Sequence, residues 1–523
     1  MRLLPTSVQS FKTLRENGYL YVDKTKYIWD LVESGGREYF LSRPRRFGKS
    51  LFLSTIEEYF LGRKDLFNGL YIFDKENDRG EKAWLQYPVI KFALSGGSYD
   101  TPNGLSEILR QVLLQAESRY EVKPDTEDLA ARFKTDIQLI CEKCGLPVVV
   151  LVDEYDKPLL ETEGTEQNEN NRELYKAFFS VIKDQDEFIK FVFFTGVTKY
   201  SKVSIFSDLN QLKDISLLKK YSSICGITED EMKAVFEPEI HGMADELHIS
   251  VGDCLEELRM RYDGYHFSED SEGVYNPFSL LNALFDHEFG DYWFESGTPT
   301  FLVKKLTDSS VSLNSLINGI SCDSYEMRDY RMDDPDPVPL FYQSGYLTIK
   351  NYDRRFDSYE LGFPNEEVKY GFLKSLVPYV FGGSDRSKAF SVTNMVKALE
   401  KGDGTLLFEQ LYSIFAGIPY MEKGTSKYES VWRNQIYLIF LLVGQYVTCE
   451  EHLSGGRSDC VVETQNYIWI FEFKVDKTAA EAINQIDEKD YAGKYLSDSR
   501  KVIKAGVDFS SEKRNIDDWD TIM

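Results

Sequence analysis

The chain has 523 residues, which is more than one hydrophobic core usually supports, so we expect several domains. Hydrophobic residues make up 42% and charged residues 28%, and 35 Gly with 16 Pro are too few for a disordered or fibrous chain. The net charge of −25 excludes a generally basic nucleic-acid coat but leaves room for a local basic groove.

The N-terminal residues, MRLLPTSVQSF, lack the apolar region of a secretory signal. The longest apolar stretches, such as residues 436–444, are far shorter than the roughly 20 residues that cross a bilayer. Seven cysteines, an odd number spread over a long chain, argue against a disulfide scaffold. We therefore expect a cytoplasmic protein with no membrane partner.

Strand and helix patterns alternate through about the first 215 residues. Continuous apolar runs rich in β-branched residues, such as VVVLV at 148–152, are typical of buried parallel strands. The patterns predict strands at 37–42, 148–152 and 191–197 and helices at 50–60 and 174–183. This alternation indicates an α/β fold with a parallel sheet.

From about residue 220 the pattern is mainly helical, and Thr228 with Glu231 forms a capping-box signature that opens one helix. The last hundred residues predict a long apolar helix, a β-hairpin and another helix. Polar stretches are interpreted as loops or linkers at 161–172, 331–339, 381–388 and 421–427.

Gly48, Lys49 and Ser50 stand at the start of a predicted helix that follows a predicted strand, in the most basic part of the chain. Residues 1–70 hold 12 Lys and Arg against 8 Asp and Glu. A helix N-terminus offers free N–H groups and the positive end of a dipole to phosphate. We expect Lys49 to reach the β- and γ-phosphates of ATP and the Ser50 hydroxyl to bind Mg²⁺. Arg43 stands where the usual pattern, G-x-x-x-x-G-K-[ST], has its first glycine.

An acidic motif about a hundred residues later supports this nucleotide site. Asp153 follows a buried strand and can hold Mg²⁺, while Glu154 can orient an attacking water, and Thr195 ends the next strand, where it could sense the γ-phosphate. Asp156 and Lys157 are interpreted either as a local ion pair or as support for the site. Two alternatives stay open: a solvated basic turn beside an acidic strand end, and a site that binds nucleotide but hardly hydrolyses it.

A second cluster lies on the hairpin predicted near the C-terminus. Residues two apart share one face of a strand, so Glu472 and Lys474 point the same way. If Gln465 and Asn466 form a two-residue turn, Asp459 lies across the ladder from Glu472. Three more polar residues flank the hairpin: Glu429 opens the helix before it, and Gln485 and Tyr491 lie on the helix after it.

Adjacent carboxylates repel unless a cation joins them, so Mg²⁺ is the expected occupant of Asp459 and Glu472. The metal would activate water and neutralise a phosphodiester, while Lys474 would position the nucleophile or stabilise charge. The alternative is a cross-strand salt-bridge cluster on a solvated hairpin. Against it, the acid and the lysine lie within WIFEFKV, whose other residues are mostly large and apolar, and charges there cost free energy.

Motifs along nearly the whole chain resemble one family, the bacterial and archaeal AAA-ATPase-like proteins with a C-terminal PD-(D/E)XK nuclease-superfamily domain. The motifs are YVDKT (21–25), YFLSRPRRFGKSLFLS (39–54), LVDEYDKPL (151–159), FTGVTKYSKVSIFSDLNQLKDIS (194–216), YDGYHF (262–267), YWFESGTPTFL (292–302), QSGYLTI (343–349), FPNEEV (363–368), GRSDCVV (456–462) and FEFKVD (471–476).

The resemblance implies roles for particular residues. It implies that Arg43 is the family's own form of the loop, that Glu429, Asp459 and Glu472 match its acidic metal-site residues, and that Lys474 matches its catalytic lysine. Gln485 matches the polar residue of the helix after the core. The candidate nucleotide-binding residues are Arg43, Arg45, Arg46, Phe47, Gly48, Lys49, Ser50, Asp153 and Thr195. The candidate metal ligands are Ser50, Asp153, Glu429, Asp459 and Glu472, and the candidate catalytic residues are Glu154, Lys474 and Gln485.

We therefore expect an α/β protein in four parts. These are a P-loop AAA-ATPase-like domain with a parallel sheet at 1–218, a helical lid at 219–290, a mixed middle region at 291–420 and a restriction-endonuclease-like α/β domain at 421–523.

The expected function is Mg²⁺-dependent cleavage of nucleic acid, DNA rather than RNA, under the control of ATP. The alternative is a nucleotide-driven switch whose nuclease-like fold engages a partner or nucleic acid without cutting. Residues 421–523 hold 13 Lys and Arg against 18 Asp and Glu, which weighs against tight DNA binding by that part alone. A basic groove would then come from residues 1–70 or from a second protomer of a homo-oligomer.

Overall fold

The computed structural model describes the chain except for residues 1, 200–210, 296–301, 304, 307–310, 312, 329–335, 382–390, 417–434, 445–447, 452–459 and 514. The chain divides into two compact units. The first unit comprises Met1–Gly297 and Lys304–Lys369, and the second comprises Thr298–Val303 and Tyr370–Met523. Within the described ranges, no helix is both long and apolar enough to cross a bilayer.

The first unit is built on a five-stranded parallel sheet in the order β2-β3-β4-β1-β5. Its strands are β1 (Glu38–Ser42), β2 (Val89–Ala93), β3 (Val148–Asp153), β4 (Ile189–Gly196) and β5 (Lys213–Asp214). The three predicted strands are confirmed as β1, β3 and β4, while β2 and β5 were not predicted. All six residues of β3 are buried, as expected of a central parallel strand. Because β4 pairs with both β1 and β3, the ends of these three strands meet at one edge.

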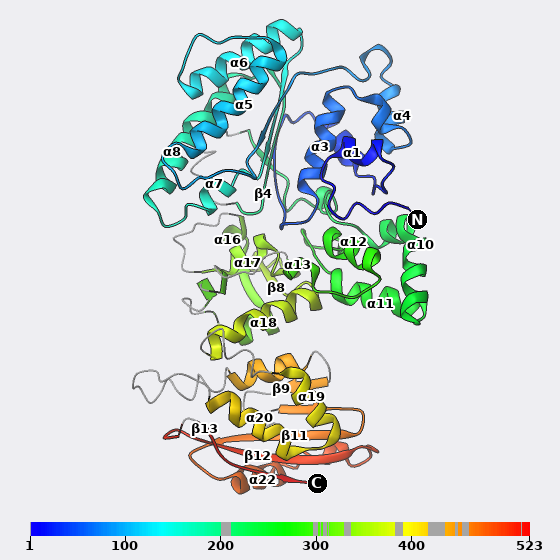
Figure 1. Cartoon of the computed structure of the whole chain (residues 1–523), viewed down its shortest axis with the longest axis vertical. Helices are drawn as coiled ribbons and strands as arrows, with labels where there is room; N and C mark the ends of the chain where they lie inside the picture. The colour runs from blue at the N-terminus through cyan, green and yellow to red at the C-terminus, as the bar shows by residue number, and fades with distance from the viewer. Residues whose placement is uncertain are drawn as a thin grey trace. The chain divides into compact units, whose positions relative to one another are not determined.

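Helices cover both faces of this sheet (Figure 1). One face carries α5 (Gly104–Tyr120), α6 (Leu129–Cys144) and α8 (Glu166–Ser180), and the other carries α1 (Phe11–Glu16) and α3 (Lys49–Phe60). The linker predicted at 161–172 is wrong in its second half, because α8 begins at Glu166. Its polar residues are used inside the fold: the side-chain amides of Asn168 and Asn171 donate to the carbonyls of Leu159 and Tyr99.

The predicted helical region of the first unit contains α10 (Glu229–Leu247), α11 (Val251–Tyr262) and α12 (Pro277–Asp286), which share one apolar core. The capping box of Thr228 and Glu231 at the start of α10 is confirmed. The rest of this unit holds α13 (Tyr292–Glu295), α17 (Val338–Ser344) and a three-stranded sheet of β6 (Ile320–Asp323), β8 (Ser358–Gly362) and β7 (Thr348–Asp353). Most of the loop predicted at 331–339 lies outside the described residues.

The second unit is built on the sheet β13-β12-β11-β10-β9. Its strands are β9 (Thr448–Glu451), β10 (Cys460–Glu463), β11 (Tyr467–Val475), β12 (Lys501–Ser510) and β13 (Asn515–Ile522). The predicted hairpin is confirmed as β10 and β11, and the helix after it as α22 (Ala479–Glu488). Residues 435–443, within the predicted long apolar helix, are helical. Strands β12 and β13 were not predicted.

Two helices from the predicted middle region pack on this second sheet, α19 (Val392–Lys401) and α20 (Gly404–Ala416). The indole N–H of Trp469 on β11 donates to the carbonyl of Leu399, and the ring of Phe408 stacks on Trp519. The chain passes from the first unit to the second within α18 (Glu366–Phe381). A compact unit can hold several domains, so the four-part division stays a prediction.

Candidate nucleotide and nuclease sites

Residues 43–48, the predicted phosphate-binding loop, join the end of β1 to the start of α3. Gly48 has φ 88° and precedes the first residue of α3, Lys49. A left-handed residue at this point is easily supplied only by glycine, and it turns the chain so that the helix N-terminus faces the loop. The backbone N–H of Arg43 donates to the carbonyl of Gly196, which fixes the beginning of the loop to the end of β4.

Lys49 is buried inside this loop. Its Nζ donates to the carbonyl oxygens of Arg43 at 3.0 Å and Pro44 at 2.8 Å. Burial lowers the pKa of the Lys49 ammonium, and the negative charges of Asp153 and Glu154 oppose that effect. The ammonium is therefore held by backbone carbonyls of the loop and stabilised by the negative charges at the end of β3.

The acidic end of β3 is joined to the end of β4. The hydroxyl of Thr195 donates to Oδ1 of Asp153 at 2.5 Å, and both residues are buried. Thr195 pairs with Leu41 of β1 in the sheet register, so it stands between the loop and Asp153. The structure thus brings together Lys49, Asp153 and Thr195, as the sequence predicted, although their roles stay predictions.

Glu154 has a backbone conformation that non-glycine residues rarely adopt, with φ 55°. Burial raises the pKa of its carboxyl, and the negative charge of Asp153 raises it further. Its backbone N–H approaches the Thr195 hydroxyl at 3.4 Å. Such local strain persists only where the surrounding structure enforces it, and it is often found at functional positions.

The alternatives for Asp156 and Lys157 are resolved by their contacts. Oδ2 of Asp156 accepts hydrogen bonds from the N–H and the hydroxyl of Thr198, at 2.6 and 2.9 Å, and from the N–H of Val197 at 3.1 Å. Asp156 therefore supports the segment that follows Thr195. Lys157 instead donates to the carbonyl of Ser95.

Arg43 has a buried side chain, only 1% exposed, that points into the protein. Its guanidinium donates to the carbonyls of Ser42, Ser216 and Tyr221 at 2.8–2.9 Å and lies over the ring of Phe267 at 4.0 Å. Burial lowers the pKa of this guanidinium. The geometry favours a bracing role for the Arg43 side chain over the nucleotide contact that the sequence predicted.

The other two arginines of the loop also rest on aromatic rings. The guanidinium of Arg45 lies 4.9 Å from the centre of the Trp293 ring, and that of Arg46 lies 4.5 Å from the centre of the Phe278 ring. The indole N–H of Trp293 also donates to the carbonyl of Arg45 at 3.1 Å. Phe47 packs edge-on against the aromatic rings of Tyr265 and Phe267. No local pattern in the sequence marks these aromatic partners, because they lie more than 200 residues from the loop.

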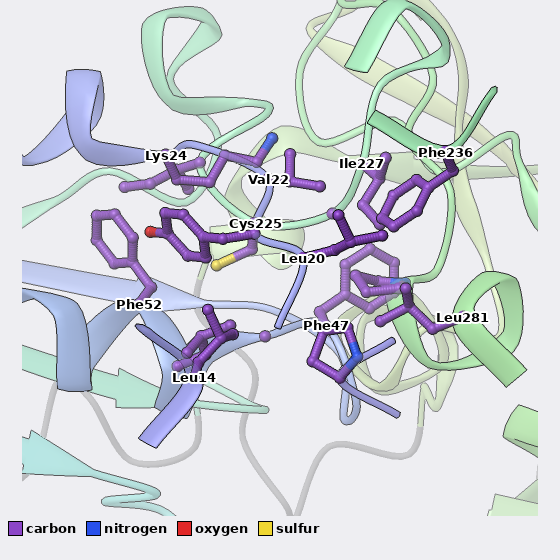
Figure 2. A pocket seen from close by; sticks show the side chains of 17 residues that line it. Leu14, Leu20, Val22, Lys24, Phe47, Phe52, Cys225, Ile227, Phe236 and Leu281 are labelled. Carbon is purple, nitrogen blue, oxygen red and sulfur yellow. The ribbon is translucent and has the colours of Figure 1, made fainter. Parts of the chain in front are cut away.

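A small cavity of about 80 Å³ lies beside Gly48 (Figure 2). Leucine, valine, isoleucine and phenylalanine side chains line most of it, and Lys24 and Cys225 add polar atoms at its wall. Its lining residues are Pro5, Leu14, Leu20, Tyr21, Val22, Lys24, Phe47, Gly48, Leu51, Phe52, Ile224, Cys225, Gly226, Ile227, Phe236, Pro277 and Leu281. The motif YVDKT supplies three of them, but its spacing did not identify a pocket.

The hairpin of β10 and β11 has the predicted register. The N–H of Thr464 donates to the carbonyl of Tyr467 across the two-residue turn, and Cys460 pairs with Phe471. The predicted pairing of Asp459 with Glu472 falls outside the described residues and stays a prediction. Asp459 itself and Glu429 lie outside the described residues, so two of the three predicted metal-site acids stay untested.

Glu472, Lys474 and Gln485 form a closed triangle of polar contacts. Nζ of Lys474 lies 3.0 Å from Oε1 of Glu472 and donates to Oε1 of Gln485 at 2.5 Å, while Nε2 of Gln485 donates back to Glu472. Glu472 is only 2% exposed. The prediction that Tyr491 lies on the same helix as Gln485 is wrong, because α22 ends at Glu488.

No group of three or more His, Cys, Asp or Glu side chains that could hold a metal ion is found within the described ranges. At the nucleotide site the candidate ligands are Ser50, at the start of α3, and Asp153. A hydroxyl and a carboxylate suit Mg²⁺, which binds a few protein oxygens and completes its shell with water and phosphate. At the hairpin, Glu472 is the one predicted ligand within the described residues.

Comparisons with known proteins identify two domains in the chain. Residues 5–206 match a family model described as "Predicted AAA-ATPase", and residues 427–519 match the PD-(D/E)XK nuclease superfamily. The chain is also 36% identical over 523 residues to the "Uncharacterized protein in vnfD 5'region" of Azotobacter chroococcum mcd 1, covering 98% of this chain and 97% of that one. The two matches fall on the phosphate-binding loop and on the hairpin respectively. The chain therefore belongs to the AAA-ATPase-like family whose members carry a C-terminal PD-(D/E)XK nuclease-superfamily domain.

Proposed function

We propose that the first unit binds ATP with Mg²⁺ and hydrolyses it. The observation that carries this proposal is the buried Lys49 ammonium, held by two loop carbonyls and facing Asp153. A buried ammonium is costly unless it is paired, and an anion at the loop would pair it. We expect the triphosphate to take the place of the carbonyls of Arg43 and Pro44 as the partner of Nζ.

Other residues of this edge have separate tasks in the proposal. Ser50 and Asp153 would hold Mg²⁺, which when bound supplies positive charge to the β- and γ-phosphates. Thr195 keeps the Asp153 carboxylate oriented through its hydrogen bond. Glu154, whose pKa is raised by burial, is suited to accepting a proton from the attacking water.

The cavity beside Gly48 is the natural place for the base of the nucleotide. Its walls are apolar and include the aromatic side chains of Phe47 and Phe52, which suits a flat ring system (Figure 2). A volume of about 80 Å³ is small for a purine, so the walls would move apart on binding.

We propose further that the second unit cleaves phosphodiester bonds of nucleic acid, with DNA as the expected substrate. The contact triangle of Glu472, Lys474 and Gln485 supports this proposal, because it places a charged pair within an otherwise apolar strand. Glu472 would share Mg²⁺ with Asp459 and Glu429. Lys474 would hold the scissile phosphate or the attacking water, and Gln485 fixes the Lys474 side chain.

A second candidate is a nucleotide-driven switch whose nuclease-like fold does not cut. Residues 421–523 favour it, since they hold 13 Lys and Arg against 18 Asp and Glu and so lack the positive balance of most DNA-binding domains. In this case the hairpin cluster would bind a partner rather than turn over a substrate.

The test uses the purified full chain with Mg²⁺, with and without ATP, on linear, circular and single-stranded DNA and on RNA. The matched control is Lys474→Ala, which removes the ammonium and leaves the first unit unchanged. Cleavage by the wild type and none by the variant supports the nuclease proposal. Absence of cleavage under every nucleotide condition, with ATP hydrolysis intact, supports the switch.

A further inference from the structure

Segments from several sequence motifs contact the predicted phosphate-binding loop. One buried acid, Glu367, makes hydrogen bonds to two of these segments. Glu367, from FPNEEV at the start of α18, is 2% exposed. Its Oε2 accepts a hydrogen bond from the hydroxyl of Ser279 at 2.7 Å, and its Oε1 accepts one from the N–H of Trp293 at 2.7 Å. One carboxyl therefore ties α12 to α13.

The two residues that Glu367 holds belong to the aromatic supports of the loop. Ser279 follows Phe278, whose ring lies under the guanidinium of Arg46. Trp293 lies under the guanidinium of Arg45 and donates its indole N–H to the carbonyl of the same residue. The two oxygens of one side chain thus hold Trp293 directly and Phe278 through its neighbour Ser279.

We infer that Glu367 is a positioning residue for the phosphate-binding loop: it fixes the rings of Phe278 and Trp293, and these rings set the place of Arg46 and Arg45 beside the phosphates. This inference rests on the proposed ATP site for its effect on nucleotide, but its effect on the loop itself does not depend on ATP. Glu367 acts through other residues and has no described contact with the loop.

The packing around the loop leaves little freedom for the supports to shift. Trp293 is fully buried and packs against the ring of Tyr346. A Cβ added at Gly345 would come within 2.6 Å of the Pro44 side chain, so the backbone after α17 also presses on the loop. In such a packed environment the loss of the hydrogen bonds at Glu367 is expected to reach the loop.

The first measurement is amide hydrogen exchange of residues 43–48 in the nucleotide-free full chain. Glu367→Ala should speed exchange roughly tenfold, because it removes at least two buried hydrogen bonds. Burial raises the pKa of Glu367 to about 8, so the group is mostly neutral at pH 7 and Glu367→Gln should keep exchange near the wild-type rate. Glu366→Ala, on the same helical turn and half-buried, is the matched control and should also leave it unchanged.

The second measurement is the affinity for Mg·ATP by calorimetry. Glu367→Ala should weaken it roughly tenfold, with a smaller change in kcat than in KM, because a misplaced loop loses contacts made in both ground and transition states. If Glu367→Ala fails to fold, Ser279→Ala removes one hydrogen bond with little change in volume and should speed loop exchange by a smaller factor.

The outcomes separate the two ideas. Loop exchange that is the same in the Glu367→Ala, Ser279→Ala and Glu366→Ala variants overturns the positioning role, whatever the affinity for ATP. If loop exchange is faster in Glu367→Ala than in the wild type, and the wild type itself binds no ATP, the positioning role is upheld and the proposed ATP site is overturned.

Discussion

The Arg43 side chain makes hydrogen bonds that the glycine of the usual loop pattern could not make. Its buried guanidinium donates to three backbone carbonyls, those of Ser42, Ser216 and Tyr221. Its backbone φ is not positive, so the residue needs none of the freedom that glycine provides. The conformational demand falls instead on Arg46, with φ 65°, and on Gly48.

Arg43→Gly, which restores the usual pattern, should therefore destabilise the protein. Three buried carbonyls lose their donors and a cavity opens under Phe267, so we expect a loss of about 3 kcal/mol in the free energy of unfolding. Differential scanning calorimetry measures the change, with Arg43→Lys as a variant that keeps the charge and part of the donors. A glycine variant as stable as the wild type would contradict the bracing role.

Lys49 and Glu154 should separate binding from hydrolysis. Lys49→Ala removes the ammonium that we expect to grip the phosphates, so ATP binding should fall below detection. Glu154→Gln keeps the phosphate contacts and should bind ATP while slowing hydrolysis about 100-fold or more, the usual scale of general-base loss. Calorimetry and steady-state ATPase rates are the two measurements. ATP affinity unchanged by Lys49→Ala would rule out the loop as a phosphate site.

At the residue scale, the sequence predicted residues that follow a recognisable strand, but it missed contact partners that lie far away along the chain. Lys49 and Asp153 could be recognised because each follows a predicted strand at a fixed spacing. Trp293 and Phe278 could not, because their partners lie more than 200 residues away and no periodicity marks them. The side-chain direction of Arg43 depends on carbonyls from three separate segments, which only the folded chain brings together.

At the scale of elements, the hairpin shows how strongly a short turn fixes register. A two-residue turn allows only one pairing of the residues of β10 with those of β11. The burial of Val461, Ile468 and Ile470 is consistent with that pairing. Strands β12 and β13 were not predicted, and for β13 the composition explains why. β13 is an edge strand rich in Asp, a composition that protects sheet edges and that resembles a loop in sequence.

The hairpin predicts the effect of three substitutions. Asp459→Asn and Glu472→Gln should weaken Mg²⁺ binding, and Lys474→Ala should leave the metal but lose the charge aimed at the phosphate. Each should reduce cleavage by at least about 100-fold while ATP hydrolysis continues, because the two sites lie on different elements. Cleavage and ATPase rates are compared on one preparation of each variant. Full cleavage by the Lys474→Ala and Asp459→Asn variants would make the cluster structural.

The contact of α18 with α12 and α13 predicts a pH dependence of stability. The Glu367 pKa is about 8 in the folded protein because of burial, against an ordinary value of 4.5. Between these values the folded protein keeps a proton that the unfolded chain releases. The stabilising contribution of this group is therefore complete below pH 4.5, declines as pH rises, and is lost at about pH 8.

Glu367→Gln should remove this decline, which amounts to at most about 1.4 kcal/mol per pH unit for one proton. Thermal unfolding between pH 6 and 9 measures the difference in slope from the wild type. Glu366→Gln, on the same turn, should keep the wild-type slope. Equal slopes in the wild type and Glu367→Gln would show that Glu367 titrates as an ordinary acid.

At the scale of the whole molecule, two sites lie on one chain and their coupling is a measurable quantity. If the nucleotide state controls cleavage through a shared equilibrium, a variant that cannot bind ATP should cut at a changed rate. Lys49→Ala should then lower cleavage at least about fivefold, with the Lys474→Ala variant as the reference for no cutting. Normal cleavage by Lys49→Ala, with ATP binding lost, would mean two independent enzymes on one chain.

The sequence predicted the fold class of the molecule, and its predicted domain bounds stay predictions. The alternation of strands and helices, and the hairpin with its helix, located both sheets. The boundary between compact units falls at residues 369 and 370, inside α18. A compact unit can hold several domains, so the predicted start of the C-terminal domain at residue 421 stays a prediction. Helices α19 and α20 pack on β11 and β13 of the second unit, a long-range contact that no local sequence pattern marks.

The place of positive φ in residues 43–48, the predicted phosphate-binding loop, bears on how such loops are recognised in genomes. A search pattern written with glycine at the first position rejects this chain, although the backbone at Arg43 does not require one. A pattern that demands glycine only at the residue before the helix, where φ is 88°, accepts it. Annotation by conformational requirement would therefore recover phosphate-binding loops that annotation by consensus letters discards.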